Sequence, residues 1–274
     1  MQTLLNHCRE RATVSQSENG IELGFGRSVT VEELGGFGID PAESRPMMEE
    51  AIRLIPRLWE GRRFSGYEGQ YVSIPPRVIV PKPIQQPHPP LWMACSTASS
   101  FEAAGHYGLG CLSFTSPGAG DLGDLLASYR DALNAAIPAG KSVNAQAAAF
   151  TTVYCAPDNA EALSRGGRAS TAHFGRISQY FGGISSHKGY EQYGANVEER
   201  EKFASGEMAP ETLIDEPRMC IGDPEHCMSV IAALMDLGVD QFLGLVQFSD
   251  ISHGESLRTI ELMGEHVIPR FGGM

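Results

Sequence analysis

The chain has 274 residues and a formal net charge of −12, from 33 acidic and 21 basic side chains. Hydrophobic residues make up 42% of it and charged residues 20%, which is ordinary for a folded protein and excludes a wholly disordered one. The acidic excess argues against nucleic acid as a partner, because binding phosphates requires a basic surface. The length is sufficient for one large α/β barrel, which needs about 250 residues.

No stretch approaches the roughly 20 consecutive apolar residues that span a bilayer, so the sequence predicts no membrane partner. Residues 1–14 carry charges where a signal peptide needs an apolar run, and the six cysteines form no C-x-x-C pair. We therefore expect a cytoplasmic protein without disulfides. The eight histidines are far apart in sequence, and we expect no metal site.

Helix and strand patterns alternate from the beginning of the chain. Residues 3–18 are predicted to be helical, and residues 21–25 to form a short buried strand. Apolar residues at i, i+4 spacing predict a helix over 46–59, whose last turn Pro56 should kink or shorten. Residues 64–90 are rich in turns and prolines, so we expect an extended excursion on the surface.

The same alternation continues to the end of the chain. The predicted strands are 91–95, 110–114, 147–155 and 241–246, and the predicted helices are 96–107, 121–136, 224–237 and 255–267. Residues 182–220 lack periodicity and are predicted to be an insertion or lid, with His187, Tyr190 and Tyr193 as candidates to cover a substrate. Apolar strands alternating with helices predict a parallel sheet with helices outside. Five strands are predicted in all, three fewer than a closed barrel requires.

The first candidate for ligand binding is Arg27. It lies in a glycine-containing turn, residues 24–28, at the carboxyl end of the first predicted strand, where α/β folds bind ligands. A guanidinium can hold a phosphate by two hydrogen bonds. For this residue alone, an ion pair with Glu32 or Glu33 is the simpler explanation.

A second candidate is the serine-rich turn after the strand 91–95. Ser96, Thr97 and Ser100 surround the start of a helix, where free backbone amides and hydroxyl groups can bind an anion or simply cap the helix. This turn and Arg27 occur at the same end of neighbouring strands, so together they predict phosphate binding. Phe114 ends the next strand and can pack against a flat heterocycle or serve as a core residue.

The segments that carry these residues resemble the bacterial luciferase-like family of flavin-dependent monooxygenases. The matching segments are 21–28, 37–45, 67–71, 81–90, 221–225 and 238–242. The resemblance implies a single TIM-type (β/α) barrel domain over residues 1–274, commonly in a dimer. It also implies reduced FMN as the cofactor or, in a sister branch, a deazaflavin.

The resemblance assigns roles to the candidate residues. Arg27 corresponds to the arginine that contacts the FMN phosphate, Thr97 and Ser100 complete that site, Ser96 lies beside them, and Phe114 lies near the isoalloxazine ring. It implies that a separate flavin reductase supplies reduced FMN, which reacts with O₂ to oxygenate a small organic substrate. The protein would orient the flavin and exclude water.

The chain departs from the family at its beginning. Asn6–Arg9 resembles the start of the helix after the third strand of the family, so three strands and the family's catalytic histidine have no counterpart, and no catalytic residue is predicted. We expect an incomplete barrel with about five of eight strands, as a fragment, a shortened gene model, a subunit closed by itself or a partner, or a degenerate relative. A deazaflavin-dependent dehydrogenase and a non-catalytic flavin-binding subunit are the alternative functions.

Overall fold

The computed structural model describes residues 20–115, 121–194, 201–202, 205, 207 and 219–271, so the predicted helix 3–18 lies outside the described residues. The chain forms two compact units. The first consists of Met1–Arg27, Ile39–Cys111 and Ser128–Gln146, and the second of Ser28–Gly38, Leu112–Ala127 and Ala147–Met274.

The first unit contains the first two predicted strands. β1 (Leu23–Phe25) pairs in parallel with β4 (Leu91–Cys95), and β4 neighbours β5 (Gly110–Phe114), whose first two residues belong to this unit. Leu91, Trp92 and Met93 are buried, as expected for a strand covered on both faces. The predicted strands 91–95 and 110–114 are confirmed.

The first unit also contains two helices, α3 (Pro41–Trp59) and α4 (Ala98–His106), of which α4 packs against β4. α3 begins one turn earlier than predicted, because the Asp40 carboxylate caps it by accepting a hydrogen bond from the Ala42 amide at 2.9 Å. Pro56 lies inside α3, and the helix ends at Trp59, within one turn of it.

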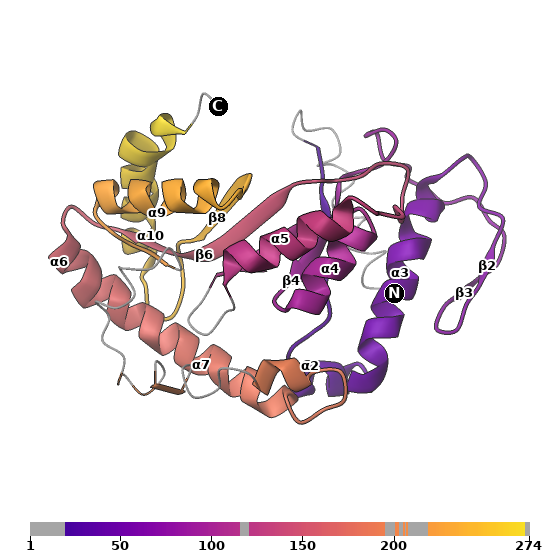
Figure 1. The fold of residues 1–274 in the computed structure, drawn as a ribbon, viewed down its shortest axis with the longest axis horizontal. Helices are drawn as coiled ribbons and strands as arrows, with labels where there is room; N and C mark the ends of the chain where they lie inside the picture. The colour runs from indigo at the N-terminus through magenta and orange to yellow at the C-terminus, as the bar shows by residue number, and fades with distance from the viewer. Residues whose placement is uncertain are drawn as a thin grey trace. The chain divides into compact units, whose positions relative to one another are not determined.

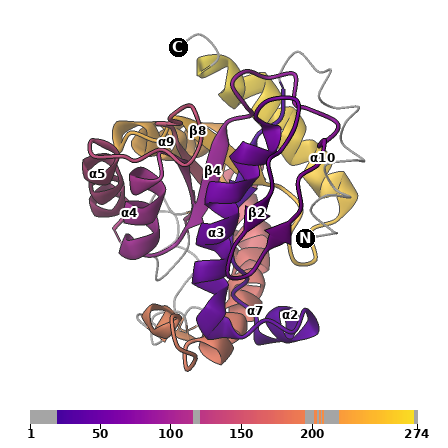
Figure 2. The ribbon, with the colours of Figure 1, turned by 90° about the vertical axis from the view of Figure 1, so that its right-hand side faces the viewer.

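The predicted excursion contains a short antiparallel hairpin, β2 (Tyr67–Glu68) and β3 (Ser73–Ile74). Figures 1 and 2 both show it beside α3. Leu54 and Leu58 of α3 form a small buried cluster with Phe64 and Ile74, which attaches the excursion to the helix.

A buried carboxylate strengthens this attachment. Glu50 of α3 is 8% exposed and accepts hydrogen bonds from the amides of Gln70 at 3.0 Å, Tyr71 at 3.1 Å and Val72 at 2.9 Å. Three amides on one carboxylate satisfy its buried oxygens. Glu50 therefore fixes the loop of the hairpin to α3.

The second unit is built on the long strand β6 (Ala147–Cys155), which is almost wholly buried. Residues 148–152 of β6 pair in parallel with β8 (Gln241–Leu245), and residues 153–155 pair in parallel with β7 (Cys220–Gly222). The prediction missed β7, because a three-residue strand shows no periodicity and directly precedes a helix cap. The sheet therefore has six strands where five were predicted.

The helices that begin in or lie within the second unit are α2 (Val31–Gly36), α5 (Leu122–Leu133, which continues into the first unit), α6 (Asn159–Ala162), α7 (Arg168–Ile184), α9 (Pro224–Asp236) and α10 (His253–Leu262). Figure 1 shows α7 as the longest helix of this unit. α7 extends into the region predicted to be an insertion. α10 continues as a π-helix over Met263–Val267, so the predicted end of this helix at residue 267 is confirmed. The short helix α2 was not predicted, although Thr30 caps it.

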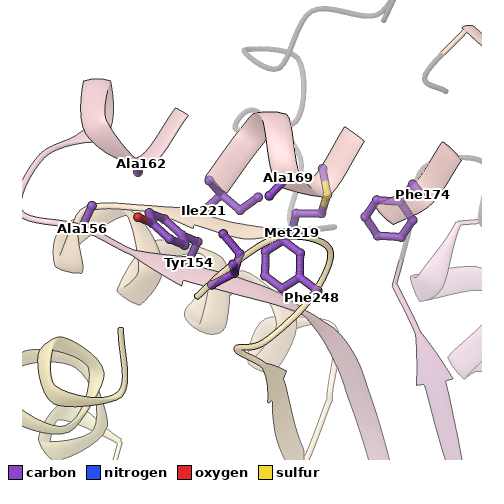
Figure 3. Close-up of a cluster of buried hydrophobic side chains, with 9 residues drawn as sticks. Tyr154, Ala156, Ala162, Ala169, Phe174, Met219, Ile221 and Phe248 are labelled. Carbon is purple, nitrogen blue, oxygen red and sulfur yellow. The ribbon is translucent and has the colours of Figure 1, made fainter. Parts of the chain in front are cut away.

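The core of this unit is a cluster of buried side chains from the strands, helices and loops, drawn in Figure 3. It contains Tyr154, Ala156, Ala162, Ala169, Phe174, Met219, Ile221, Phe248 and Ile251. Within the described residues the sheet does not close into a complete barrel. The predicted fold class, an incomplete α/β barrel, is confirmed.

Candidate functional site

The first site residue, Arg27, follows β1 at its carboxyl end. Phe25, the last residue of β1, is the register partner of Met93 in β4, and Arg27 follows two residues later in the chain. The Nη1 atom of Arg27 is buried. Arg27 and the serine-rich turn thus follow the carboxyl ends of two strands that pair in parallel.

The serine-rich turn forms the N-terminus of α4, with Thr97 as the N-cap. The Ser100 hydroxyl accepts hydrogen bonds from the amides of Ser96 and Thr97, each at 3.0 Å, and donates to the Thr97 carbonyl at 2.7 Å. Ser100 is buried, whereas Ser96 and Ser99 are exposed. Ser100 thus shapes the turn, and the more exposed residues present their polar groups around it.

A second guanidinium, which sequence reasoning missed, lies at the same turn. Arg45, in the first turns of α3, donates from Nη2 to the Ser99 hydroxyl at 3.0 Å. Its only signal in the sequence is that it ends a segment, 37–45, that resembles the family. The predicted helix started at residue 46, which left Arg45 outside any predicted element.

This donor set fits a phosphate group. The first turn of α4 contains no acidic residue, and first-turn amides of a helix have no partner within the helix. The positive end of the helix dipole and the Arg45 guanidinium both favour an anion there. A dianionic phosphate monoester matches this combination of amides, hydroxyls and cations.

Phe114, the remaining predicted site residue, belongs to the second unit. Its ring centroid lies 5.1 Å from that of Phe150 and 5.6 Å from that of Phe174, with the latter pair stacked. His173 of α7 contacts Phe174 and Phe248 edge-on. We call Phe114, Phe150, His173, Phe174 and Phe248 the aromatic cluster. Phe114, Phe150 and His173 are partly exposed.

Two candidates from the region 182–220 are interior residues of the second unit. Tyr190 is fully buried, and its hydroxyl donates to the Ser28 carbonyl at 2.8 Å. Tyr193 is 6% exposed and stacks on Phe181 at 5.2 Å. His187 is partly exposed at the end of α7. Through Tyr190, this region holds the backbone of the residue that follows Arg27 in the chain.

Within the part of the chain that the structure describes, no group of His, Cys, Asp or Glu has metal-binding geometry. Five cysteines in that part are free and buried. The hydrogen bond that the Cys155 thiol donates to Cys227, together with burial, raises the pKa of Cys155, which disfavours a reactive thiolate. Over the same described ranges, no helix combines the length and apolar character needed to cross a bilayer.

The comparison with protein families decides the classification. The model of the family described as luciferase-like monooxygenase matches residues 12–241. This chain belongs to the luciferase-like monooxygenase family. The resemblance stated from sequence is therefore confirmed, and with it oxidoreductase chemistry of the monooxygenase type as the family's character.

Curated relatives match over short segments. An uncharacterized protein y4wF of Sinorhizobium fredii is 35% identical over 79 residues, which are 29% of this chain and 23% of the relative. The oxygenase component of a flavin-dependent trigonelline monooxygenase of Acinetobacter baylyi is 34% identical over 67 residues, 24% of this chain and 18% of the relative. The matched segments thus span less than a quarter of these relatives' lengths.

Solved structures match nearly the whole chain. The monooxygenase RslO1 of Streptomyces bottropensis has a TM-score of 0.72 and 25% identity, over 97% of this chain and 74% of its own. The F420-dependent tetrahydromethanopterin reductase of Methanopyrus kandleri has a TM-score of 0.63 and 21% identity, over 97% and 79%. The oxygenating constituent of 3,6-diketocamphane monooxygenase of Pseudomonas putida, in complex with FMN, has a TM-score of 0.61 and 18% identity, over 91% and 70%. The latter two likenesses establish the fold.

Proposed function

We propose that this chain is a flavin-dependent monooxygenase, or a subunit of one, that binds reduced FMN by its phosphate at the N-terminus of α4. The observation that carries this proposal is the Arg45–Ser99 hydrogen bond at 3.0 Å, in a helix turn that contains no acidic residue. Arg27 follows β1, the parallel neighbour of the strand that precedes this turn, which supports its inclusion in the site. Family membership supports it, because named relatives include a flavin-dependent monooxygenase.

The residues of the site divide the task of holding the phosphate. Arg27 and Arg45 supply positive charge, the Thr97 hydroxyl and first-turn amides supply hydrogen bonds, and Ser100 keeps the turn in shape. Ser96 borders the turn. When bound, reduced FMN supplies the reaction with O₂, and the protein's part is to fix the position of the cofactor and to keep water from it. For Phe114, contact with the isoalloxazine ring is a proposal that rests on the family resemblance.

The partners in this proposal are a small organic substrate and a separate reductase. The relative from Acinetobacter baylyi is named as an oxygenase component, which supports the idea of a second protein that supplies reduced flavin. A homodimer or a partner subunit that completes the barrel is proposed on the same family resemblance, since the described strands leave the barrel open.

The test compares FMN with riboflavin, which lacks the phosphate. We expect the parent protein to bind FMN at least tenfold more tightly in a fluorescence titration, because a charge-assisted hydrogen bond contributes about 1.5–3 kcal/mol. Arg27→Ala and Arg45→Ala should each remove most of this preference. Arg62→Ala, at an exposed arginine of the first unit, is the matched control and should keep it.

Equal affinity of the parent for FMN and riboflavin would refute the phosphate site. Retention of the full preference in Arg27→Ala would remove that residue from it.

A deazaflavin-dependent dehydrogenase is the second candidate, because a solved structure with this fold is an F420-dependent reductase. Oxygen consumption with chemically reduced FMN supports the monooxygenase. Hydride transfer to a deazaflavin from an alcohol supports the dehydrogenase. Flavin binding without either activity identifies a non-catalytic subunit.

A further inference from the structure

The aromatic cluster of the second unit presents ring surface to solvent. Phe174 and Phe248 are buried at 3% and 4% exposure and anchor the cluster in the core, where Figure 3 shows them on α7 and on the loop after β8. Phe114, Phe150 and His173 are partly exposed beside them. Exposed aromatic faces backed by a rigid core suit the binding of another flat ring.

His173 is the polar member of this cluster. Its ring lies 5.5 Å from that of Phe174 and 5.8 Å from that of Phe248, with interplanar angles of 74° and 62°. Two edge-on contacts hold the imidazole from two sides. Both nitrogens lack a hydrogen-bond partner among the described residues.

The environment favours the neutral form of His173. Burial lowers its pKa below the ordinary 6.5, and the positive charge of Arg176, on the same helix, lowers it further. On the loop after β8, the charged group next to Phe248 is Asp250, which is paired with Arg165 at 3.0 Å. A neutral imidazole has one nitrogen that accepts a hydrogen bond and one that donates.

The loop that carries Phe248 contains local backbone strain. Ser249, the next residue, has φ of +53° and is the sole non-glycine residue with positive φ among those that the structure describes. Strained residues of this kind cluster at functional sites. Arg165 holds the same loop through the Asp250 carbonyl at 2.7 Å, so the position of Phe248 against His173 is well fixed.

We propose that His173 is a specificity-determining residue that accepts a hydrogen bond from the hydroxyl group of an aromatic substrate of the phenol class, whose ring packs on Phe114 and the neighbouring rings of the cluster. As a statement about substrate, this inference rests on the proposed monooxygenase function. The hydrogen bond itself requires only the second unit.

The experiment measures binding of two probes by calorimetry at pH 8. 4-Methylphenol carries the hydroxyl donor, and 4-methylanisole is the same ring with the donor replaced by a methyl ether. We expect the phenol to bind about three- to tenfold more tightly, which is the factor that one neutral hydrogen bond provides. Protonation removes the acceptor nitrogen of His173, so the preference should fall as the pH is lowered through its depressed pKa.

Three variants test the residue. His173→Phe keeps a flat ring between Phe174 and Phe248 but removes the acceptor, so it should bind both probes equally. His173→Gln retains an acceptor and should restore part of the preference. His253→Phe, at the exposed first residue of α10, is the matched control and should behave as the parent.

Two results overturn the proposal: a parent protein without preference for the phenol, or His173→Phe with the preference intact. Binding of 4-methylanisole by His173→Phe shows that the variant is folded. Preference for FMN over riboflavin, measured in the same samples, reports separately on the proposed function, so that either idea can fail alone.

Discussion

Two helices of this protein begin directly after a parallel strand, yet only one of them is suited to bind an anion. α4 follows β4 with Thr97 as its cap and no acidic residue in its first turn. α9 follows β7 with Asp223 as its cap, Pro224 at the next position and Glu225 in the first turn. The same arrangement of strand and helix therefore has a helix start without acidic residues in α4 and an acidic helix start in α9.

The difference lies in what satisfies each helix end. The Asp223 carboxylate accepts from the His226 amide at 2.8 Å, and Pro224 has no amide hydrogen, so α9 is closed by its own residues. In α4 the cap is made of neutral hydroxyls, and Arg45 adds a positive charge at Ser99. The helix dipole is thus compensated internally in α9 and left available in α4. The residues of the first helical turn, more than the order of strand and helix, determine which helix is suited to bind an anion.

Giving α4 the carboxylate that α9 has should produce the largest effect. Ala98 is the exposed first residue of α4, and Ala98→Asp would place a negative charge where the FMN phosphate is proposed to bind. We expect FMN affinity to fall by about ten- to a hundredfold while riboflavin affinity hardly changes. Ala98→Asn, which is similar in size and uncharged, is the control. Unchanged FMN binding in Ala98→Asp would show that the phosphate lies elsewhere.

A third helix start, that of α10, shows the internal compensation at its strongest. Glu255 accepts from the Ser252 amide at 2.8 Å and pairs with Arg165, and these contacts lower the pKa of Glu255 to about 2. The depressed pKa means that this stabilisation is present above about pH 4.5 and is lost as the pH falls towards 2.

In Glu255→Gln we expect about 1–2 kcal/mol less stability at pH 7, allowing for solvent screening of this partly exposed pair. Chemical denaturation at a series of pH values measures it. The difference between variant and parent should shrink with acid, and a difference independent of pH would contradict this account.

The smallest effect is expected at α9 itself. Asp223→Ala removes the cap and should lower the free energy of unfolding by about 1 kcal/mol, because the His226 amide loses its acceptor. Thermal unfolding checks this value, and FMN affinity should be the same as in the parent. A loss of FMN affinity in this variant would mean that α9, too, contributes to cofactor binding.

The sequence alone suggested Arg27 and the serine-rich turn as parts of the proposed anion site because each has a local signal. Strands 21–25 and 91–95 have apolar patterns, and the residues that end them, Arg27 and Ser96, are placed at one edge by parallel pairing. Arg45 escaped prediction for an equally local reason. The sequence predicted that α3 begins at residue 46, whereas Asp40 caps it about one turn earlier. Arg45 was therefore placed outside the helix, and the direction of its side chain could not be predicted.

Other features had no local signal at all. β7 is three residues long, and its burial comes from pairing with the end of β6, which lies far away in the sequence. His173 lies in α7 among residues with a helical pattern, but the aromatic surroundings of its ring include Phe248, which lies in a loop far away in the sequence. Contacts between residues that are distant in the sequence determine the environment of β7 and of His173, and they produce no periodic pattern in the local sequence.

The hydrogen bonds from the hairpin loop to Glu50 have a consequence for how the sequence of this loop can vary. Glu50 binds only main-chain amides of residues 70–72, so its contacts do not depend on which side chains these residues carry. Gly69 is the exception, because a Cβ there would lie 2.3 Å from a Glu50 oxygen. The Tyr71 hydroxyl, which donates to Glu43 of α3, and Val72, which packs against the buried cluster, add side-chain contacts of their own. The solvent-facing side chains of this loop can therefore vary in sequence while the contacts of Glu50 with its backbone stay the same.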